Sequence, residues 1–469
     1  MIGVLPNDAP CPESERGQYM EDLTQRIEPY GTQRTQQISP FGERTQQVGA
    51  GAPTVMGAPM RALQMECLLG REVGNAYGGR EHLLVEITGT SAGVGRRLPL
   101  NLCLVIDRSG SMEGEPIDYV KRACGYVVDL LDQNDILSII TFSDTVDVVM
   151  PARRVVNKTL IKEHIQRIDI GNTTNLYDGM LVGCQQVAAV MSEQVLTRVL
   201  VFTDGEPTSG IKDFASIVQL AAEQKARGIT ITVLGFGPEF NEELLAGIAR
   251  RSGGNYYYIQ RPELIPEVFR RELELLMTVV AKNVRLILTL PRFTQTRQVY
   301  GAQPNVQGRV VEIPQVDIER GAVVTQLVEF DLQMRPPGKY RVAKVALAYD
   351  DTITGRVERI EADAVMEFTQ DVSRIPQAIH PRVQREIEIQ QLSRNLERTV
   401  MGLKTQQLSA AEVRQELERT MAMLTRQGRL QEAQEIQQAL SALGSDTSVV
   451  EKTLMGTAYS LEVGKSKQP

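Results

Sequence analysis

Oxygen-bearing side chains follow an apolar run early in the chain. In the stretch LVIDRSGSMEG the run ends at Asp107, and Ser109 and Ser111 follow at alternate positions. Three interpretations fit an isolated pattern of this kind: a nucleophile with its helpers, a metal site, or a turn whose serines cap a helix that begins near Glu115. The elements around the stretch have to decide between them.

Residues 99–280 alternate between short apolar runs and amphipathic segments with helical spacing. The apolar runs are continuous, which is typical of strands buried on both faces of a sheet. Strands that alternate with helices predict a mostly parallel sheet covered on both faces, a doubly wound α/β fold. The predicted strands are residues 100–107, 136–142, 198–204, 229–237 and 255–259, and the predicted helices are residues 116–131, 175–191, 214–228 and 241–254.

Three polar segments fall at the predicted carboxyl ends of these strands. They are residues 107–111, the glycine- and hydroxyl-rich loop of residues 171–179, and the Thr203–Asp204–Gly205 turn. In an open parallel sheet, ligands bind at this edge, near the point where the strand order reverses. We therefore expect two carboxylates and several hydroxyls to meet there.

A hard cation suits this mixture of oxygen ligands. Mg²⁺ prefers oxygen ligands in near-octahedral geometry and keeps some of its waters. With few charged ligands bound directly, the metal would stay electrophilic enough to accept a carboxylate from a partner. The histidines, His82, His164 and His380, have no metal-ligand spacing, which disfavours zinc.

The residues that predict the cation also carry a family resemblance. Asp107-x-Ser109-x-Ser111, a later threonine and Thr203-Asp204-Gly205 resemble the metal-ion-dependent adhesion site of von Willebrand factor type A (VWA) domains. The similarity spans residues 99–280, and segments such as PLNLCLVIDRSGSM and VLVFTDGEPTSGI are similar to bacterial members. It implies a Mg²⁺ or Mn²⁺ ion and the capture of a partner protein whose acidic residue completes the metal shell. The implied ligands are Asp107, Ser109, Ser111, a threonine and Asp204.

Two neighbouring threonines compete for the fourth position. The family usually places its ligand threonine directly before Asn or Asp and a helix, which selects Thr174 before Asn175 and leaves Thr173 as the alternative. Asp178 and Glu206 lie close by in sequence. We interpret both as solvated loop charges.

The rest of the chain divides into four further segments. Strand-like runs separated by Gly and Pro turns predict a β-sandwich over residues 281–372, and we expect the strands of residues 61–98 to join it, so that the VWA domain is inserted in the sandwich. Residues 373–445 predict a helical bundle. Residues 1–60, rich in Thr and Gln, and residues 446–469 are interpreted as a disordered N-terminal tail and a loose C-terminal tail.

No enzymatic motif accompanies the polar segments. GSMEG is not a G-x-S-x-G elbow, GFGPEF lacks the last glycine of G-x-G-x-x-G, and no P-loop motif occurs. A Mg²⁺-dependent phosphotransferase or hydrolase with Asp107 as nucleophile is the best enzymatic alternative, but it would want an acid where Ser109 stands. We therefore predict a binding protein rather than an enzyme, with a purely structural scaffold as the second alternative.

The tails contain threonines in a recurring context. Thr35 in RTQQI and Thr45 in RTQQV each have an aliphatic residue three positions later, and Thr54 and Thr453 lie in PTVMG and KTLMG. This context resembles the phosphothreonine peptides that forkhead-associated domains bind after a Ser/Thr kinase has acted. The resemblance implies four phosphorylation sites and a signalling system that contains such a kinase and such a domain. An inert linker is the alternative.

Bulk composition sets limits on the partners. The net charge of −7 argues against nucleic acid, because phosphate binding needs a basic face. The five cysteines form no CxxC pair, which favours a reduced compartment. No signal peptide and no apolar run of about 18 residues is present, so we expect no membrane insertion and a cytoplasmic location.

Overall fold

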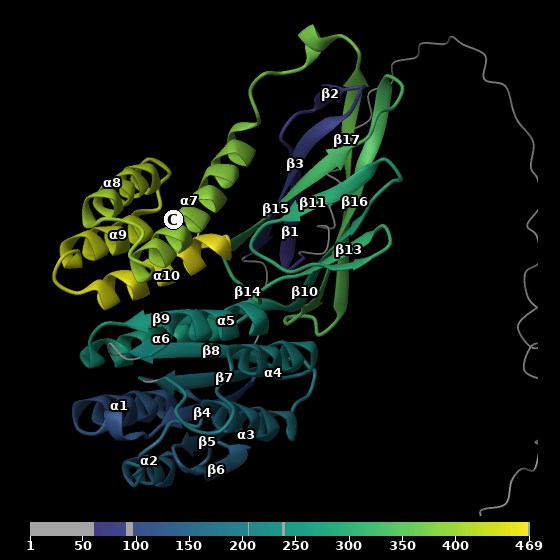
Figure 1. Ribbon diagram of the computed structural model, residues 1–469. Helices are drawn as coiled ribbons and strands as arrows, with labels where there is room; N and C mark the ends of the chain where they lie inside the picture. The colour runs from purple at the N-terminus through teal and green to yellow at the C-terminus, as the bar shows by residue number, and fades with distance from the viewer. Residues whose placement is uncertain (1–60, 91–96, 205, 237–239, 468–469) are drawn as a thin grey trace, which may run out of the picture. The chain divides into compact units, whose positions relative to one another are not determined.

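The computed structural model describes residues 61–90, 97–204, 206–236 and 240–467. These residues form three sheets and ten α-helices (Figure 1). One sheet belongs to an α/β domain, and the other two share a separate core. Among the described residues, no helix combines the length and the apolar character needed to cross a membrane.

The α/β domain is built on a six-stranded sheet with the order β6-β5-β4-β7-β8-β9. All neighbouring strands are parallel except β5 and β6. The predicted parallel sheet is therefore confirmed. Its strands are β4 (Leu100–Asp107), β5 (Ile136–Phe142), β6 (Val146–Arg154), β7 (Leu196–Thr203), β8 (Thr230–Phe236) and β9 (Tyr256–Ile259).

Helices cover both faces of this sheet. All eight residues of β4 are buried, and they alternate between the two faces: Cys103 and Val105 pack with α3, α4 and α5, whereas Leu104 and Ile106 pack with α1, α2 and α6. The helices are α1 (Glu115–Leu130), α2 (Lys158–Gln166), α3 (Leu176–Ala188), α4 (Phe214–Ala226), α5 (Glu242–Ser252) and α6 (Ile265–Met277). Continuous apolar strands and amphipathic helices thus meet in two cores, one on each side of the sheet.

Two mostly antiparallel sheets share a third core. Strands from before the α/β domain pair with strands that follow it. For example, β3 pairs with β15 from Thr88–Val323 to Gly79–Leu332. One sheet contains β1 (Leu63–Leu69), β3 (Gly79–Gly89), β15 (Ala322–Leu332), β11 (Thr294–Val299) and β18 (Lys465–Lys467). The other contains β12 (Asn305–Gln307), β13 (Val310–Pro314), β10 (Val279–Thr289), β14 (Ile318–Glu319), β16 (Gly338–Asp351), β17 (Val357–Thr369) and β2 (Val73–Asn75).

Four helices follow the sheets: α7 (Pro381–Lys404), α8 (Ala410–Arg426), α9 (Leu430–Ala442) and α10 (Thr447–Glu462). The first three lie within residues 373–445, the segment predicted to form a helical bundle. Ser409 begins α8 with a capping box, in which its side chain and that of Glu412 each bond the other's backbone N–H.

The C-terminal segment differs from its prediction as a loose tail. Residues 447–462 form α10, and residues 465–467 form a short strand that pairs with β15. Asp446 caps the helix by accepting a hydrogen bond from the N–H of Val449 at 3.1 Å. Val450, Leu454 and Ala458 recur every four residues, so one face is buried in the core that α5 and β9 also share. This apolar face is what makes the segment a packed helix.

Candidate metal centre

Three loops meet at the carboxyl edge of the six-stranded sheet. The first loop (residues 107–111) starts at the last residue of β4, and the second loop (residues 169–175) leads into α3. The third loop starts at the last residue of β7, and its described residues are 203–204 and 206–209. β4 lies between β5 and β7, so the chain leaves it toward β5 on one side and reaches β7 on the other. This is the switch point at which doubly wound sheets bind ligands.

The carboxylate of Asp107 is the buried centre of the cluster. One oxygen accepts the N–H of Ser109 at 2.9 Å, and the other accepts the hydroxyl of Thr203 at 2.6 Å. Burial raises the pKa of Asp107 to about 7 although these hydrogen bonds oppose the change, and the charge of Asp204 raises it further. A buried carboxylate in this position is stabilised by a cation.

The hydroxyls of the first loop connect to the third loop. The oxygens of Ser109 and Ser111 are 3.2 Å apart, and Ser111 donates to Oδ1 of Asp204 at 2.8 Å. Adjacent ligands of an octahedral Mg²⁺ at about 2.0–2.1 Å are themselves about 2.9 Å apart. The spacing of these three oxygens therefore fits neighbouring positions around such an ion.

The two candidate threonines have different surroundings. The hydroxyl of Thr173 donates to Asp144 at 2.9 Å and lies 2.9 Å from the hydroxyl of Ser209. Thr174 is buried, and its backbone bonds residues 208 and 209. No described residue bonds the Thr174 hydroxyl, which leaves it free for another ligand. The arrangement favours Thr174, as the sequence motif does.

The helix-capping interpretation of the two serines does not hold. Helix α1 begins after Gly114, and its N-terminus has no side-chain cap. The short 3₁₀ helix at residues 110–112 follows Ser109, whose side chain makes no cap hydrogen bond there either. The serine hydroxyls face each other and Asp204 instead.

The two nearby acidic residues, Asp178 and Glu206, lie outside the cluster. Asp178 accepts from the side-chain amide of Asn175 at 2.8 Å, so it belongs to the cap of α3 rather than to the cation site. Glu206 is exposed. Neither residue is drawn into the cluster by a bond among the described residues.

Sequence reasoning missed the contribution of the turn after β5. Asp144 accepts hydrogen bonds from Asn172 and Thr173 and so supports the second loop. Ser143 is fully buried, and its hydroxyl has no partner among the described residues. The signal was a polar pair, Ser-Asp, directly after a buried strand at the same edge of the sheet.

Comparison with known proteins identifies the α/β domain. Residues 101–271 match the family model of the von Willebrand factor type A domain. The chain contains a VWA domain. A solved structure described as von Willebrand factor type A from Catenulispora acidiphila has the same fold, with a TM-score of 0.68 and 17% identity over 82% of this chain and 91% of that one.

Two curated relatives contain similar sequence. The uncharacterized protein sll0103 of Synechocystis sp. is 30% identical over 56% of this chain and 64% of its own length. The uncharacterized protein YfbK of Escherichia coli is 29% identical over 39% of this chain and 32% of its own length. The chain thus spans less than two thirds of either relative. VWA domains are generally metal-dependent protein-interaction modules, and they often bind a divalent metal.

The structure describes the surroundings of one of the four predicted phosphorylation sites. Thr453 lies in α10, is 6% exposed and accepts a hydrogen bond from the side chain of Gln260 at 3.4 Å. That burial contradicts the interpretation of Thr453 as part of an accessible tail. Thr35, Thr45 and Thr54 lie outside the described residues.

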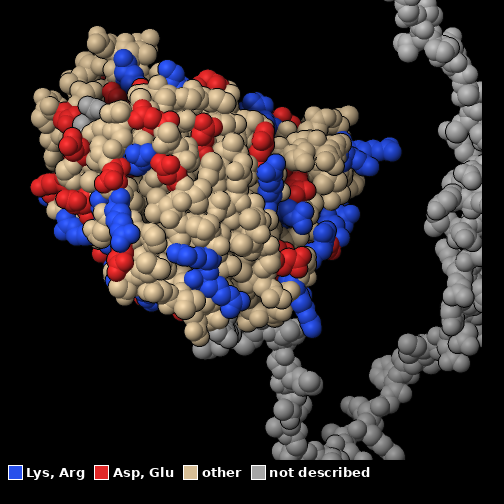
Figure 2. All heavy atoms as spheres, turned by 90° about the horizontal axis from the view of Figure 1, so that it is seen from below, with Lys and Arg blue, Asp and Glu red and all other residues tan. Residues whose placement is uncertain are grey.

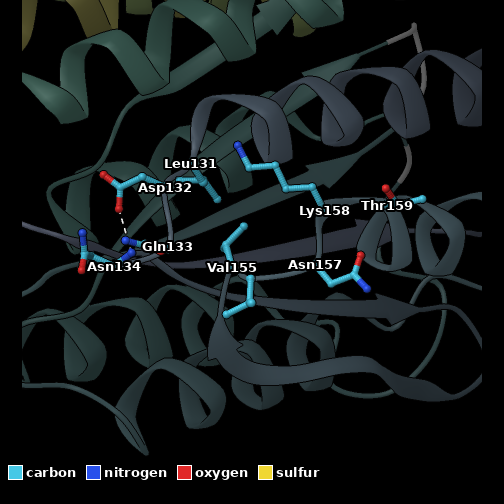
Figure 3. Close-up of a pocket in the computed structure, with 9 residues that line it drawn as sticks. Leu131, Asp132, Gln133, Asn134, Val155, Asn157, Lys158 and Thr159 are labelled. Carbon is cyan, nitrogen blue, oxygen red and sulfur yellow. Dashed lines mark hydrogen bonds between the residues drawn. The ribbon is translucent and has the colours of Figure 1, made fainter.

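A separate pocket opens at the other end of the VWA sheet (Figure 3). It has a volume of about 860 Å³ and is lined by residues 131–134 and 155–159, where β5 begins and β6 has ended. Its charged side chains are already engaged, since Asp132 accepts the N–H of Asn134 and Lys158 donates to the carbonyl of Asp129. The pocket does not adjoin the three loops.

Proposed function

We propose that the chain is a metal-dependent protein-binding scaffold. A Mg²⁺ or Mn²⁺ ion would be held at the carboxyl edge of the VWA sheet by Asp107, Ser109, Ser111, Thr174 and Asp204. The observation that carries the proposal is the continuous contact of the serine hydroxyls with each other and with Asp204, beside the buried carboxylate of Asp107.

The chemistry of these groups suggests what the partner provides. Three of the five proposed ligands are neutral hydroxyls, and the oxygens of Asp107 are already hydrogen-bonded to Ser109 and Thr203. A divalent cation held in this way keeps Lewis acidity, and its preference for oxygen favours a carboxylate as the next ligand. The partner would therefore present an Asp or Glu side chain to the ion.

Binding rather than catalysis fits the surroundings of the site. His82 lies in β3, His164 in α2 and His380 at the start of α7, so no histidine lies in the three loops that could act as a base beside the serines. Among the described residues, no group of three His, Cys, Asp or Glu side chains could hold a metal, which leaves a hydroxyl-rich set as the candidate.

The charges on one face of the molecule favour a protein partner over nucleic acid. Lys and Arg are interspersed with Asp and Glu on the face shown in Figure 2, whereas nucleic-acid binding uses a basic stripe.

We further propose that the two antiparallel sheets form a sandwich that the VWA domain interrupts. This sandwich and the four C-terminal helices would serve as the scaffold, and the protein would act in the cytoplasm.

The proposed signalling context depends on the N-terminal segment. Phosphorylation of Thr35, Thr45 and Thr54 by a Ser/Thr kinase would create ligands for a forkhead-associated domain, since a phosphate adds negative charge and strong acceptors to a peptide. Phosphopeptide mapping of the protein from its native cells tests this context. Unmodified Thr35 and Thr45 under all growth conditions would remove it and leave the metal-dependent scaffold untouched.

Metal-dependent capture is the direct test of the proposal. Titration calorimetry with Mg²⁺ and Mn²⁺ on the full chain establishes whether the ion binds, and pull-downs with and without EDTA establish whether partners need it. Asp107→Asn removes the central charge at nearly constant volume, and the exposed Asp363→Asn in β17 is the matched control. We expect EDTA and Asp107→Asn each to abolish capture. Partners retained under both conditions would overturn the proposal.

A further inference from the structure

The residue between the first two proposed ligands is an arginine whose side chain turns away from the cation site. The guanidinium of Arg108 donates to Asp147 in β6 at 2.7 Å and to the hydroxyl of Thr145 at 3.1 Å. It also donates to the carbonyl of Asp169 at 3.4 Å. The side chain is 15% exposed, although it lies at the surface edge of a sheet.

The backbone of Arg108 joins the same neighbours. Its N–H donates to the carbonyl of Phe142 at the end of β5, and its carbonyl accepts the N–H of Gly171 at 2.6 Å. Gly110 then donates to the carbonyl of Asn172 at 3.2 Å. The first loop is therefore tied to the β5–β6 turn on one side and to the second loop on the other.

The space around Gly171 is too small for a side chain. A Cβ atom at position 171 would lie 2.2 Å from the hydroxyl oxygen of Ser143 and 3.0 Å from a guanidinium nitrogen of Arg108. The second loop thus passes between these two side chains with room for a glycine. The guanidinium of Arg108 therefore packs directly against the loop that carries Thr174.

We propose that Arg108 is a positioning residue of the cation site, an inference that rests on the proposed function. It holds the second loop, which carries Thr174, against the first loop. Asp147 has a second task in this arrangement, because it neutralises a positive charge that would otherwise repel a divalent cation next to Asp107. A partner's carboxylate is then left to the metal and is not diverted to Arg108.

The pair Lys162–Asp129 provides a matched control for the pair Arg108–Asp147. Both join neighbouring elements of the VWA domain at 2.7 Å, and both carboxylates are about half exposed. Ion pairs with such exposure contribute little to folding. A change in thermal stability therefore does not separate the two pairs, whereas loop order and metal affinity do.

The experiment compares Arg108→Ala, Arg108→Lys, Asp147→Ala and Lys162→Ala in the full chain. Hydrogen exchange of residues 169–175 in EDTA measures how well the second loop is ordered without metal. Calorimetry with Mn²⁺ measures the metal affinity of the site. We expect Arg108→Ala to speed exchange in this segment and to weaken Mn²⁺ binding roughly 10–100-fold, the range for supporting residues of metal ligands. Arg108→Lys should restore part of the affinity, Asp147→Ala should weaken Mn²⁺, and Lys162→Ala should match the unaltered chain.

The two readouts keep this inference separate from the proposed function. Unchanged exchange in Arg108→Ala overturns the positioning role, whatever the metal does. Faster exchange with unchanged Mn²⁺ affinity also overturns it, because loop order would then not matter to the site. An unaltered chain that binds no Mn²⁺ refutes the proposed function, and with it the role of Arg108 toward the ion.

Discussion

Ser111 donates a hydrogen bond to Oδ1 of Asp204 across 93 residues of sequence, at 2.8 Å. The bond joins the loop after β4 to the loop after β7, so the cation site depends on two neighbouring strands ending at the same level. β4 and β7 are aligned in parallel from the Leu100–Leu196 pair to the Ile106–Phe202 pair. The register of the sheet thus sets the distance between the proposed ligands.

Removal of the charge of Asp107 should separate metal binding from folding. In Asp107→Asn we expect no Mg²⁺ or Mn²⁺ binding by calorimetry, because the buried charge that faces the ion is lost. Without metal, the variant should melt at or above the temperature of the metal-free unaltered chain, since a buried carboxylate without a cation beside it costs free energy. A variant that melts well below it would show that Asp107 acts mainly in folding.

Substitutions of the two threonines of the second loop should differ in their effect on Mn²⁺ affinity. Thr174→Ala should weaken Mn²⁺ binding roughly 10-fold or more, because it removes a hydroxyl that has no partner among the described residues. Thr173→Ala should change the affinity less, because the Thr173 hydroxyl is engaged by Asp144 and Ser209. Calorimetry on both variants decides, and the reverse order of effects would assign the ligand to Thr173.

Periodicity and composition were enough to predict the sheet of the VWA domain and most of its helices. Three of the strands that match, β4, β7 and β8, are buried along their whole length. The edge strand β6 was missed because only Met150 in it is buried, so it shows no apolar run. Helix α10 was missed although its apolar residues have helical spacing, because the sequence did not show that α5 and β9 would cover that face. Contacts of that kind are made by packing rather than by local sequence.

The candidate site could be predicted from the sequence only in part. Asp107 ends a strand, and Ser109, Ser111 and Asp204 follow strands. Because the carboxyl ends of neighbouring parallel strands lie at the same edge of a sheet, the proximity of these residues could be anticipated. The supporting residues could not be identified in the same way. Arg108 reaches Asp147 across 39 residues, through the turn between β5 and β6, and no spacing rule links the two.

A buried ion pair should dominate the stability of the contact between the VWA domain and the antiparallel sheets. Arg198 in β7 donates to Asp317, which precedes β14, at 2.8 Å, and both side chains are at most 10% exposed. Asp317→Ala leaves the guanidinium buried without this partner and should cost about 3–5 kcal/mol in unfolding free energy measured with urea. The exposed pair Arg341–Asp363 is the control, and Asp363→Ala should cost less than about 1 kcal/mol. Equal losses would mean that the contact opens before the chain unfolds.

The packing of α10 should be sensitive to charge at Thr453. Thr453→Glu places a carboxylate where the residue is 6% exposed and should lower stability by about 3 kcal/mol or more. Thr405→Glu provides a matched control, because Thr405 stands in the similar context KTQQL and is exposed at the end of α7. Thermal unfolding of both variants distinguishes them. A Thr453→Glu chain as stable as the unaltered one would restore Thr453 as an accessible phosphorylation site.

Burial of Glu386 should make stability depend on pH. Burial between α7 and its neighbours raises the pKa of this carboxyl, although hydrogen bonding by Gln390 and the charge of Arg429 oppose the change. The folded chain then binds the proton more tightly than the unfolded chain, so the contribution of Glu386 to stability is greatest at acid pH. It falls as the pH rises above about 4.5, by about 1.4 kcal/mol for each unit by which the folded-state pKa is raised.

Glu386→Gln should remove that part of the pH dependence, because the amide keeps the hydrogen-bonding shape without the charge. Urea midpoints at pH 5 and pH 8 measure it: the variant should gain stability relative to the unaltered chain as the pH rises. The exposed Glu418→Gln in α8 serves as the control and should follow the unaltered chain at both pH values. Parallel pH profiles for Glu386→Gln and the unaltered chain would show that the Glu386 charge is already compensated in the folded state.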